Sequence, residues 1–353
     1  MKIHKIKDKI MWTLYYKYKC INIIDDNGAY SLWQKAIMFL HITYASFIKN
    51  EYWSIDKLKD SIEYDSSKIS EIFYSTLKRD CPCMIARFGA IEQTIVANYI
   101  SIINKKRNFK DCITGKRLYW WWDKKTRMDL TTNAGFFPNE TEMVNNFCRK
   151  VISDTDKLDV LCTWFGKEPI ILGEKEIIMV GLQEMEPWWQ KKPWTKVLEG
   201  RNVLVIHPFA EQIEQQYKNH DKLFENKDVL PLFNLKTIKA VQSIGGYSNK
   251  FNNWFEALEW MEHEMETIEF DIALIGCGAY GFSLAAYAKS LGKKAIHMGG
   301  ALQLLFGIKG ARWEDKSYHP LYNYTKLFNE YWVRPLKEYI PDAADSVENR
   351  CYW

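Results

Sequence analysis

The sequence predicts an α/β protein built on a doubly wound, mostly parallel sheet. Two observations carry this prediction. From residue 84 to residue 310, short apolar runs alternate with segments of helical periodicity, which is typical of parallel strands joined by helices. The best defined run, residues 272–275, stops at glycine and is apolar throughout, as a parallel strand covered on both faces is.

Length and composition set the class of protein. The 353 residues suffice for two domains or for one α/β domain with additions. The 48 basic and 44 acidic residues leave a net charge of only +4, so we expect no nucleic-acid partner. Aromatic residues make up 15% of the chain, which suits a core and also stacking on bases and sugar faces.

The eight cysteines include no C-x-x-C pair, so we expect reduced thiols in a cytosolic protein and no zinc site. No apolar run reaches the roughly 18 residues of a membrane helix. The basic N-terminus lacks a cleavage site of small residues, which argues against a signal peptide. These features predict a cytoplasmic protein.

Residues 1–80 are predicted to form a helical N-terminal extension, with helices over 31–49 and 68–78. Residues 1–19 interleave lysines with isoleucine, leucine and tryptophan. Such a segment can make peripheral contact with an anionic membrane surface, here the inner membrane face. It can equally be a solvated helix packed on the body, and both interpretations stay open.

The body begins with a strand over 84–88 and a helix over 90–102. Arg87 lies at the carboxyl end of this strand, where open α/β sheets bind ligands, and Glu92 lies in the first turn of the helix. A carboxylate at this place can serve a site. It can also complement the helix dipole or cap free amides, and the sequence favours neither explanation.

The alternation continues over predicted strands at 159–164, 202–206 and 236–241, and predicted helices at 140–153, 211–217 and 252–266. The strand at 202–206 delivers His207 to the ligand-binding edge. Between these elements, residues 186–194 combine prolines, tryptophans and lysines in an irregular stretch. This stretch is either a loop that holds a substrate or a surface loop anchored by its own aromatics.

The strand at 272–275 opens a β-α-β unit. Gly276, Gly278 and Gly281 spell G-x-G-x-x-G, a helix follows over 283–289, and a strand begins at 294. Such a turn suits a phosphate. A dinucleotide site would need an acidic residue about 20 positions further on, and residues 296–300 contain none. The late position of the unit also argues against NAD or FAD, so another nucleotide diphosphate is the open alternative.

Three candidates for proton transfer converge on the same edge: Glu92, His207 and His297. Positive charge can come from Arg87, Lys309 and Arg312. Transfer of a group from a nucleotide-diphosphate donor needs a base for the acceptor's proton, and positive charge or a metal for the departing diphosphate. The chain has no P-loop, G-x-S-x-G or H-E-x-x-H motif, which disfavours NTPases, serine hydrolases and zincins.

Two of these stretches carry a family resemblance. The run IARFGAIE at 85–92, paired with LGKKAIHMG at 291–299, resembles the GT-D fold glycosyltransferases of bacterial surface-glycan synthesis. Those enzymes have R-F-G-D-G-E after the first strand and A-I-D-I-G-H after the last parallel strand. The resemblance covers roughly residues 80–313 and implies a GT-D-like, Rossmann-like catalytic domain at 81–313, followed by a tail at 314–353 that packs on the body.

The resemblance implies a hexosyltransferase-like enzyme that uses a nucleotide-diphosphate sugar, with an Asp-x-Glu pair placing a divalent metal, Mn²⁺ or Mg²⁺, and the diphosphate. This chain keeps the glutamate as Glu92 but has Ala90 in place of the aspartate. The departure weakens the expectation of a metal. It moves the neutralisation of the diphosphate to Arg87, Lys309 and Arg312.

We therefore expect a glycosyltransferase of capsule, O-antigen or glycoprotein synthesis acting on a glycan, lipid-linked or protein acceptor. Glu92 would be the base or the metal-site carboxylate, His297 a second catalytic residue, and the loop with Trp188, Trp189 and Trp194 part of the acceptor site. Donor-binding candidates are Arg87, Gly89, His207, Gly276, Gly278, Gly299, Lys309 and Arg312. Alternatives are a non-catalytic nucleotide- or glycan-binding homologue and another nucleotide-dependent group transferase, for example one using S-adenosylmethionine.

Overall fold

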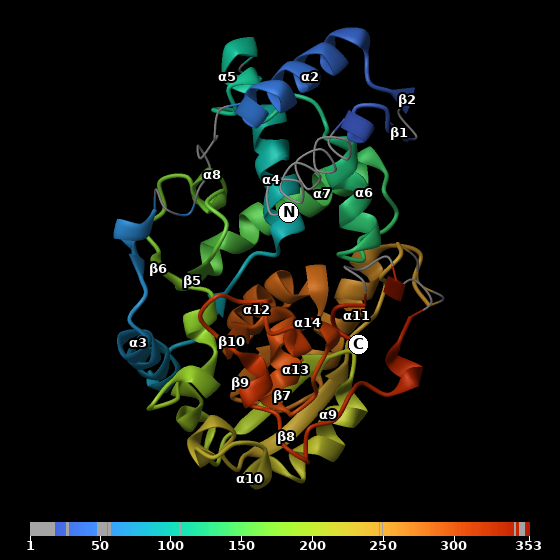
Figure 1. The fold of residues 1–353 in the computed structure, drawn as a ribbon. Helices are drawn as coiled ribbons and strands as arrows, with labels where there is room; N and C mark the ends of the chain where they lie inside the picture. The colour runs from blue at the N-terminus through green and yellow to red at the C-terminus, as the bar shows by residue number, and fades with distance from the viewer. Residues whose placement is uncertain are drawn as a thin grey trace, which may run out of the picture.

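The chain forms a single large parallel sheet covered by helices on both faces, seen in a computed structural model (Figure 1). The structure describes residues 18–25, 28–47, 55, 58–105, 107–246, 248, 250–341, 344–345 and 350–353. Within them, eight strands pair in the order β3-β6-β5-β4-β10-β9-β7-β8, every pair parallel. This confirms the predicted α/β class with a doubly wound, mostly parallel sheet.

The strands of this sheet are β3 (Ile62–Glu63), β4 (Cys83–Ala86), β5 (Val160–Thr163), β6 (Ile178–Gly181), β7 (Asn202–His207), β8 (Asn234–Lys239), β9 (Ile272–Ile275) and β10 (Lys294–His297). A separate antiparallel pair joins β1 (Ile24–Asp25) and β2 (Gly28–Ala29). The structure thus confirms the six strands predicted in the body. It adds β3 and β6, which were not predicted.

Alternating side chains of each strand enter two different cores, as the period of two in a strand requires. In β4, Cys83 and Ile85 face one core, and Met84 and Ala86 face the other. The first core takes residues from α3, α9 and α13, the second from α4, α7, α11 and α12. The sheet is therefore buried on both faces, which explains its near-continuous apolar strands.

The helices that the structure defines are α2 (Leu32–Phe47), α3 (Ser66–Lys78), α4 (Ala90–Ile103), α5 (Phe109–Ile113), α6 (Lys124–Thr132), α7 (Thr141–Asp154), α8 (Glu168–Leu172), α9 (Ala210–Tyr217), α10 (His220–Leu223), α11 (Trp254–Glu266), α12 (Gly281–Ser290), α13 (Leu302–Leu305) and α14 (Ala311–Glu314). No helix among the described residues is both long and apolar enough to cross a bilayer.

The strand order reverses at the centre of the sheet. From β4 the chain steps outward through β5 to β6, then crosses to β7 and β8, and returns through β9 to β10 beside β4. Lys294 of β10 lies in register with Cys83 of β4 and with Ile272 of β9. The carboxyl ends of β4 and β10 therefore flank the switch point, where open α/β sheets bind their ligands.

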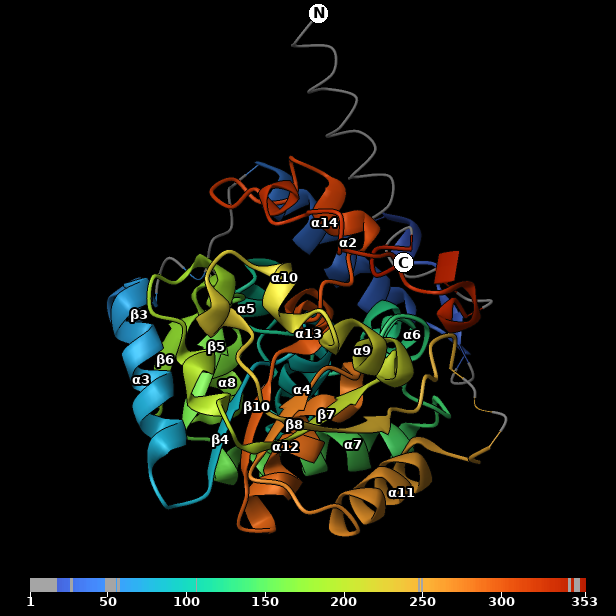
Figure 2. The ribbon, with the colours of Figure 1, turned by 90° about the horizontal axis from the view of Figure 1, so that it is seen from below.

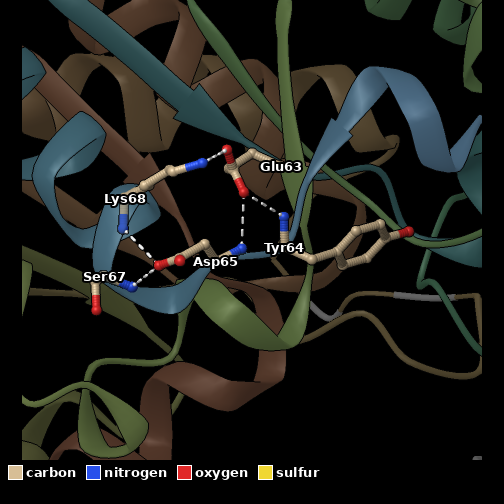
Figure 3. Close-up of polar contacts among 5 residues, drawn as sticks. All are labelled: Glu63, Tyr64, Asp65, Ser67 and Lys68. Atoms are coloured by element: carbon tan, nitrogen blue, oxygen red, sulfur yellow. Dashed lines mark hydrogen bonds and ion pairs between the residues drawn. The ribbon is translucent and has the colours of Figure 1, made fainter.

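The short edge strand β3 is tied to the start of α3 by a compact set of polar contacts (Figure 3). Asp65 caps α3, because its carboxylate accepts hydrogen bonds from the backbone N–H groups of Ser67 and Lys68 at 2.8 and 3.1 Å. The Glu63 carboxylate accepts from the Asp65 N–H and the Lys68 ammonium at 2.9 and 3.3 Å, which lowers the pKa of Glu63. Both views place α3 along the β3–β6 side of the sheet (Figure 1, Figure 2).

The N-terminal helix α2 lies apart from the sheet and packs against α5 (Figure 1). A small third core, which includes Ile37, Met38 and Trp121, fills this contact. The basic segment 1–19 falls outside the described residues except for residues 18 and 19, so its membrane contact stays a prediction. The boundaries 1–80, 81–313 and 314–353 also stay predictions, although β3 and α3 of the first segment are part of the sheet and its cover.

Candidate functional site

A cavity of about 330 Å³ lies at the carboxyl edge of the sheet. Its lining includes residues that follow β4, β5, β6, β7, β8, β9 and β10 in the chain. Of the predicted site residues, the cavity is lined by Arg87, Gly89, Glu92, His207, Gly276, Gly278, Gly299 and Arg312. His297 and Lys309 are not among its described lining residues. Strand-end reasoning thus located the edge, while the chemical role of each residue stays a prediction.

Arg87 follows β4 and extends across the switch point. Its guanidinium lies over Gly299, since a Cβ at that glycine would lie 3.1 Å from Nη1, and its Cζ sits 5.4 Å from the centre of the Trp164 ring. Nε is buried and has no hydrogen-bond partner among the described residues. A buried guanidinium donor without a partner costs free energy, and an anionic ligand would supply the missing acceptor.

Glu92 lies in the first turn of α4, which begins after Gly89. The carboxyl folds back over Gly89 so closely that a Cβ at position 89 would overlap it. Burial raises the pKa of Glu92, and the nearby positive charge of Arg87 partly opposes this rise. A carboxylate whose pKa is raised toward neutral pH is suited to accept a proton in a reaction.

The glycine turns after β9 and β10 approach each other closely. A Cβ at Gly276 would lie 2.6 Å from the carbonyl oxygen of Gly299 and 3.0 Å from Cδ2 of His207. Gly278 and Gly299 have φ angles of +59° and +65°, which residues other than glycine rarely adopt. The two turns therefore present backbone at the cavity wall, as a phosphate-binding edge requires.

The two histidines differ in their surroundings. His207 lines the cavity, and its Nδ1 accepts a hydrogen bond from the Phe209 N–H at 3.0 Å, so the neutral ring carries its proton on Nε2. Burial lowers the pKa of His207 to about 3, and the residue can donate from Nε2 but does not exchange protons near neutral pH. It is a candidate hydrogen-bond donor to the ligand.

His297 lies on the other face of the sheet's edge, against Gly281 of α12. Its Nδ1 lies 3.3 Å from the carbonyl oxygen of Ile275, and burial, with the charge of Arg87, lowers its pKa to about 3. This position gives no support to the predicted catalytic role. The strand alternation explains it, because Ala295 and His297 share the face that α12 covers.

The two other predicted cations also differ. The Lys309 ammonium lies 3.7 Å from the Glu314 carboxylate and over the Phe328 ring, away from the described cavity lining. Arg312 does line the cavity, with its Cζ 4.7 Å from the centre of the Tyr352 ring. Among the predicted cations, Arg87 and Arg312 are therefore the two at the cavity.

Several cavity residues were not predicted. Asn133 lies at the C-terminal end of α6, Ser243 follows β8, and Tyr352 comes from the C-terminal segment. The Ser243 hydroxyl donates to the Gly135 carbonyl at 2.6 Å and shares a hydrogen bond with the Tyr280 hydroxyl at 2.8 Å. Strand-end reasoning applied to β8 would have found Ser243, whereas no local signal marks Tyr352.

The tryptophan loop at 186–194 is part of the core. Trp194 is fully buried and Trp188 is 8% exposed. The indoles of Trp188 and Trp189 donate to the Glu186 carboxylate at 3.2 and 2.9 Å. None of these tryptophans is among the described lining residues of the cavity. The structure therefore favours the loop anchored by its own aromatics over the acceptor loop.

The donor set does not fit a divalent metal held by the protein alone. Glu92 has the one carboxylate side chain among the described lining residues, and Ala90 occupies the position of the family's aspartate. No group of three or more His, Cys, Asp or Glu side chains that could hold a metal ion occurs in the part of the chain that the structure describes. Mg²⁺ and Mn²⁺ prefer several oxygen ligands.

Comparison with known families identifies one domain. Residues 184–305 match the family model of the GT-D fold-like domain. This stretch contains β7 to β10 with His207 and the glycine turns. Arg87 and Glu92 precede it in the chain. Comparison with curated proteins and with solved structures gives no match.

Proposed function

We propose that this chain, whose residues 184–305 match the model of the GT-D fold-like domain, is a glycosyltransferase that uses a nucleotide-diphosphate sugar as donor. The observation that carries the proposal is the buried Nε of Arg87, which has no hydrogen-bond partner within the described part of the chain, in a guanidinium set over the Gly299 turn at the switch point of the sheet. A diphosphate offers acceptor oxygens for Arg87, and glycine turns admit its close approach.

The proposed reaction uses Glu92 as the general base. The hydroxyl oxygen of the acceptor bonds to the anomeric carbon of the donor sugar, and the bond from that carbon to the phosphate oxygen breaks. The electron pair of the broken bond leaves on the diphosphate, where Arg87 and Arg312 offset the developing charge. The acceptor's proton passes to the carboxylate of Glu92, whose raised pKa suits this transfer.

We further propose that the acceptor belongs to bacterial surface-polysaccharide synthesis, as a capsule or O-antigen precursor or a glycoprotein. This part of the proposal rests on the resemblance of residues 80–313 to enzymes of that process. A panel of nucleotide sugars identifies the nucleotide and the sugar of the donor.

Two other functions lead to different results in the same test. Ala90 and the single cavity carboxylate are what a non-catalytic nucleotide- or glycan-binding homologue would also show. The glycine turn after β9 would equally suit another group transferase, one that binds S-adenosylmethionine.

A panel of nucleotide sugars, each with and without Mn²⁺, tests the proposal by equilibrium binding and by donor hydrolysis in the full-length protein. We expect at least one nucleotide sugar to bind and to be hydrolysed slowly. Binding without turnover in the presence of candidate acceptors would favour the binding homologue. Binding of S-adenosylmethionine with no affinity for any nucleotide sugar would refute the proposal.

A further inference from the structure

One wall of the cavity is polar but uncharged. Asn133, Gln242 and Ser243 contribute amide and hydroxyl groups to it; we call these three residues the amide wall. Their elements meet through backbone contacts, since the Gly245 N–H donates to the Thr132 carbonyl at 3.2 Å. The amide wall therefore has a fixed place in the fold.

Within the amide wall, one buried side-chain acceptor lacks a hydrogen-bond partner among the described residues. The Ser243 hydroxyl is already bonded to Gly135 and Tyr280. By contrast, Oδ1 of Asn133 is buried and has no hydrogen-bond partner among the described residues. The backbone N–H of Asn133 donates to the Asp129 carbonyl at 2.9 Å. A buried amide oxygen without a donor is unfavourable for the protein alone, so we expect a ligand to provide the donor.

The remaining polar lining has a different chemistry. Arg87 and Arg312 carry positive charge, and Arg312 lies beside the Tyr352 ring. Cationic groups suit the diphosphate, and the neighbouring aromatic and guanidinium planes suit the flat nucleobase. A neutral acceptor does not suit the diphosphate, which has no proton to donate. It suits a sugar hydroxyl, which always has one, whereas a nucleobase can donate to it only from its N–H edge.

We infer that Asn133 binds a hydroxyl group of the donor's sugar and so helps to determine which sugar is transferred. The inference rests on the proposed function, and it assigns the amide wall to the sugar and the Arg312–Tyr352 side to the nucleotide. Asn133 precedes the matched stretch at 184–305, whereas Arg312 and Tyr352 follow it, so the inference has the sugar and the nucleotide contacted by distant parts of the chain.

The test compares a nucleotide sugar with the same nucleotide lacking the sugar. The probes are UDP-glucose, UDP-galactose, UDP-N-acetylglucosamine and GDP-mannose, with free UDP and GDP, titrated calorimetrically into the full-length protein. The variants are Asn133→Leu, which replaces the amide by an apolar group of the same branching, and Asn133→Asp, which keeps an acceptor. Asn145→Leu is the control, because Asn145 lies on α7 and bonds to Glu142 near the surface.

We expect Asn133→Leu to weaken binding of the preferred nucleotide sugar about tenfold or more and to leave free UDP or GDP within about twofold. Asn133→Asp should retain more of the sugar-dependent affinity than Asn133→Leu. The thermal unfolding temperature without ligand should stay equal or rise, because an unsatisfied buried acceptor is removed; a structural role for Asn133 would lower it.

Equal losses for the nucleotide sugar and the free nucleotide would overturn the inference and place the nucleobase at the amide wall. An unchanged affinity for both would overturn it as well. If the wild-type protein bound neither nucleotide sugars nor free nucleotides, the proposed function itself would fail, which is a distinct result.

Discussion

A single methyl group at position 299 would meet the guanidinium of Arg87. An added Cβ lies 3.1 Å from Nη1 and 3.3 Å from Cζ of Arg87, so the side chain has to shift by a few tenths of an ångström. In addition, the φ of +65° costs a residue with a Cβ about 1–2 kcal/mol. Gly299→Ala therefore combines a backbone cost with a displaced ligand contact.

Gly292→Ala separates the two effects. Gly292 has a φ of +76°, but a Cβ there meets nothing within 4 Å. We expect each variant to lower the free energy of unfolding by about 1–2 kcal/mol in urea titrations. Only Gly299→Ala should weaken nucleoside-diphosphate binding. We expect an affinity loss of about 10- to 100-fold, which corresponds to the loss of one hydrogen bond to a charged group.

Calorimetric titration with UDP and GDP measures the affinities of both variants. Wild-type affinity in Gly299→Ala, with the expected loss of stability, would refute the placement of the diphosphate beside Arg87. An equal loss of affinity in Gly292→Ala would show that stability rather than geometry controls binding.

Three further predictions concern proton transfer and packing. Burial raises the pKa of Glu92, and the ionised carboxylate is the form that accepts the proton. Donor turnover should therefore fall as the pH drops through this raised pKa. In a pH–rate profile, Arg87→Met should move this fall to higher pH, because it removes the positive charge that lowers the pKa of Glu92. The pKa of buried Glu186 is raised to about 8, so between about pH 4.5 and 8 the folded state binds more protons than the unfolded state. The free energy of unfolding should therefore fall as the pH rises through this window. In urea titrations at several pH values, Glu186→Gln should make this fall less steep. Trp194→Ala should cost about 3–5 kcal/mol of unfolding free energy, because Trp194 is fully buried, whereas Trp189→Ala should cost clearly less in the same urea titration.

The sequence predicted the layer structure because the strands β4, β7, β9 and β10 are apolar on both faces and end at distinctive residues. It did not predict β6, whose first residue Ile178 is exposed and which follows the charged run at 174–176. Nor did it predict β3, which has only two residues. The order of the strands in the sheet could not be predicted either, because it depends on which strands pair after the long crossover connection and not on local periodicity.

The candidate site was predictable as an edge of the sheet but not side chain by side chain. The last residue of a parallel strand points to one face of the sheet or the other. Strand-end reasoning therefore predicted both histidines at the site, whereas the structure has His207 at the cavity and His297 against α12. The tryptophan-rich loop looked like a binding surface because composition does not distinguish a buried aromatic from an exposed one. Tyr352 and Asn133 join the cavity through long-range packing, which a single sequence does not reveal.

The most direct test of the proposed transfer is donor turnover in Glu92→Gln. We predict that the variant binds the nucleotide sugar with nearly wild-type affinity while donor hydrolysis or transfer falls by about 10²- to 10⁴-fold, as expected for loss of a general base. Glu142→Gln, at an exposed position on α7, serves as the control and should turn over like the wild type. Turnover in Glu92→Gln equal to that of the wild type would contradict the assignment of the base and, with it, the proposed use of this cavity.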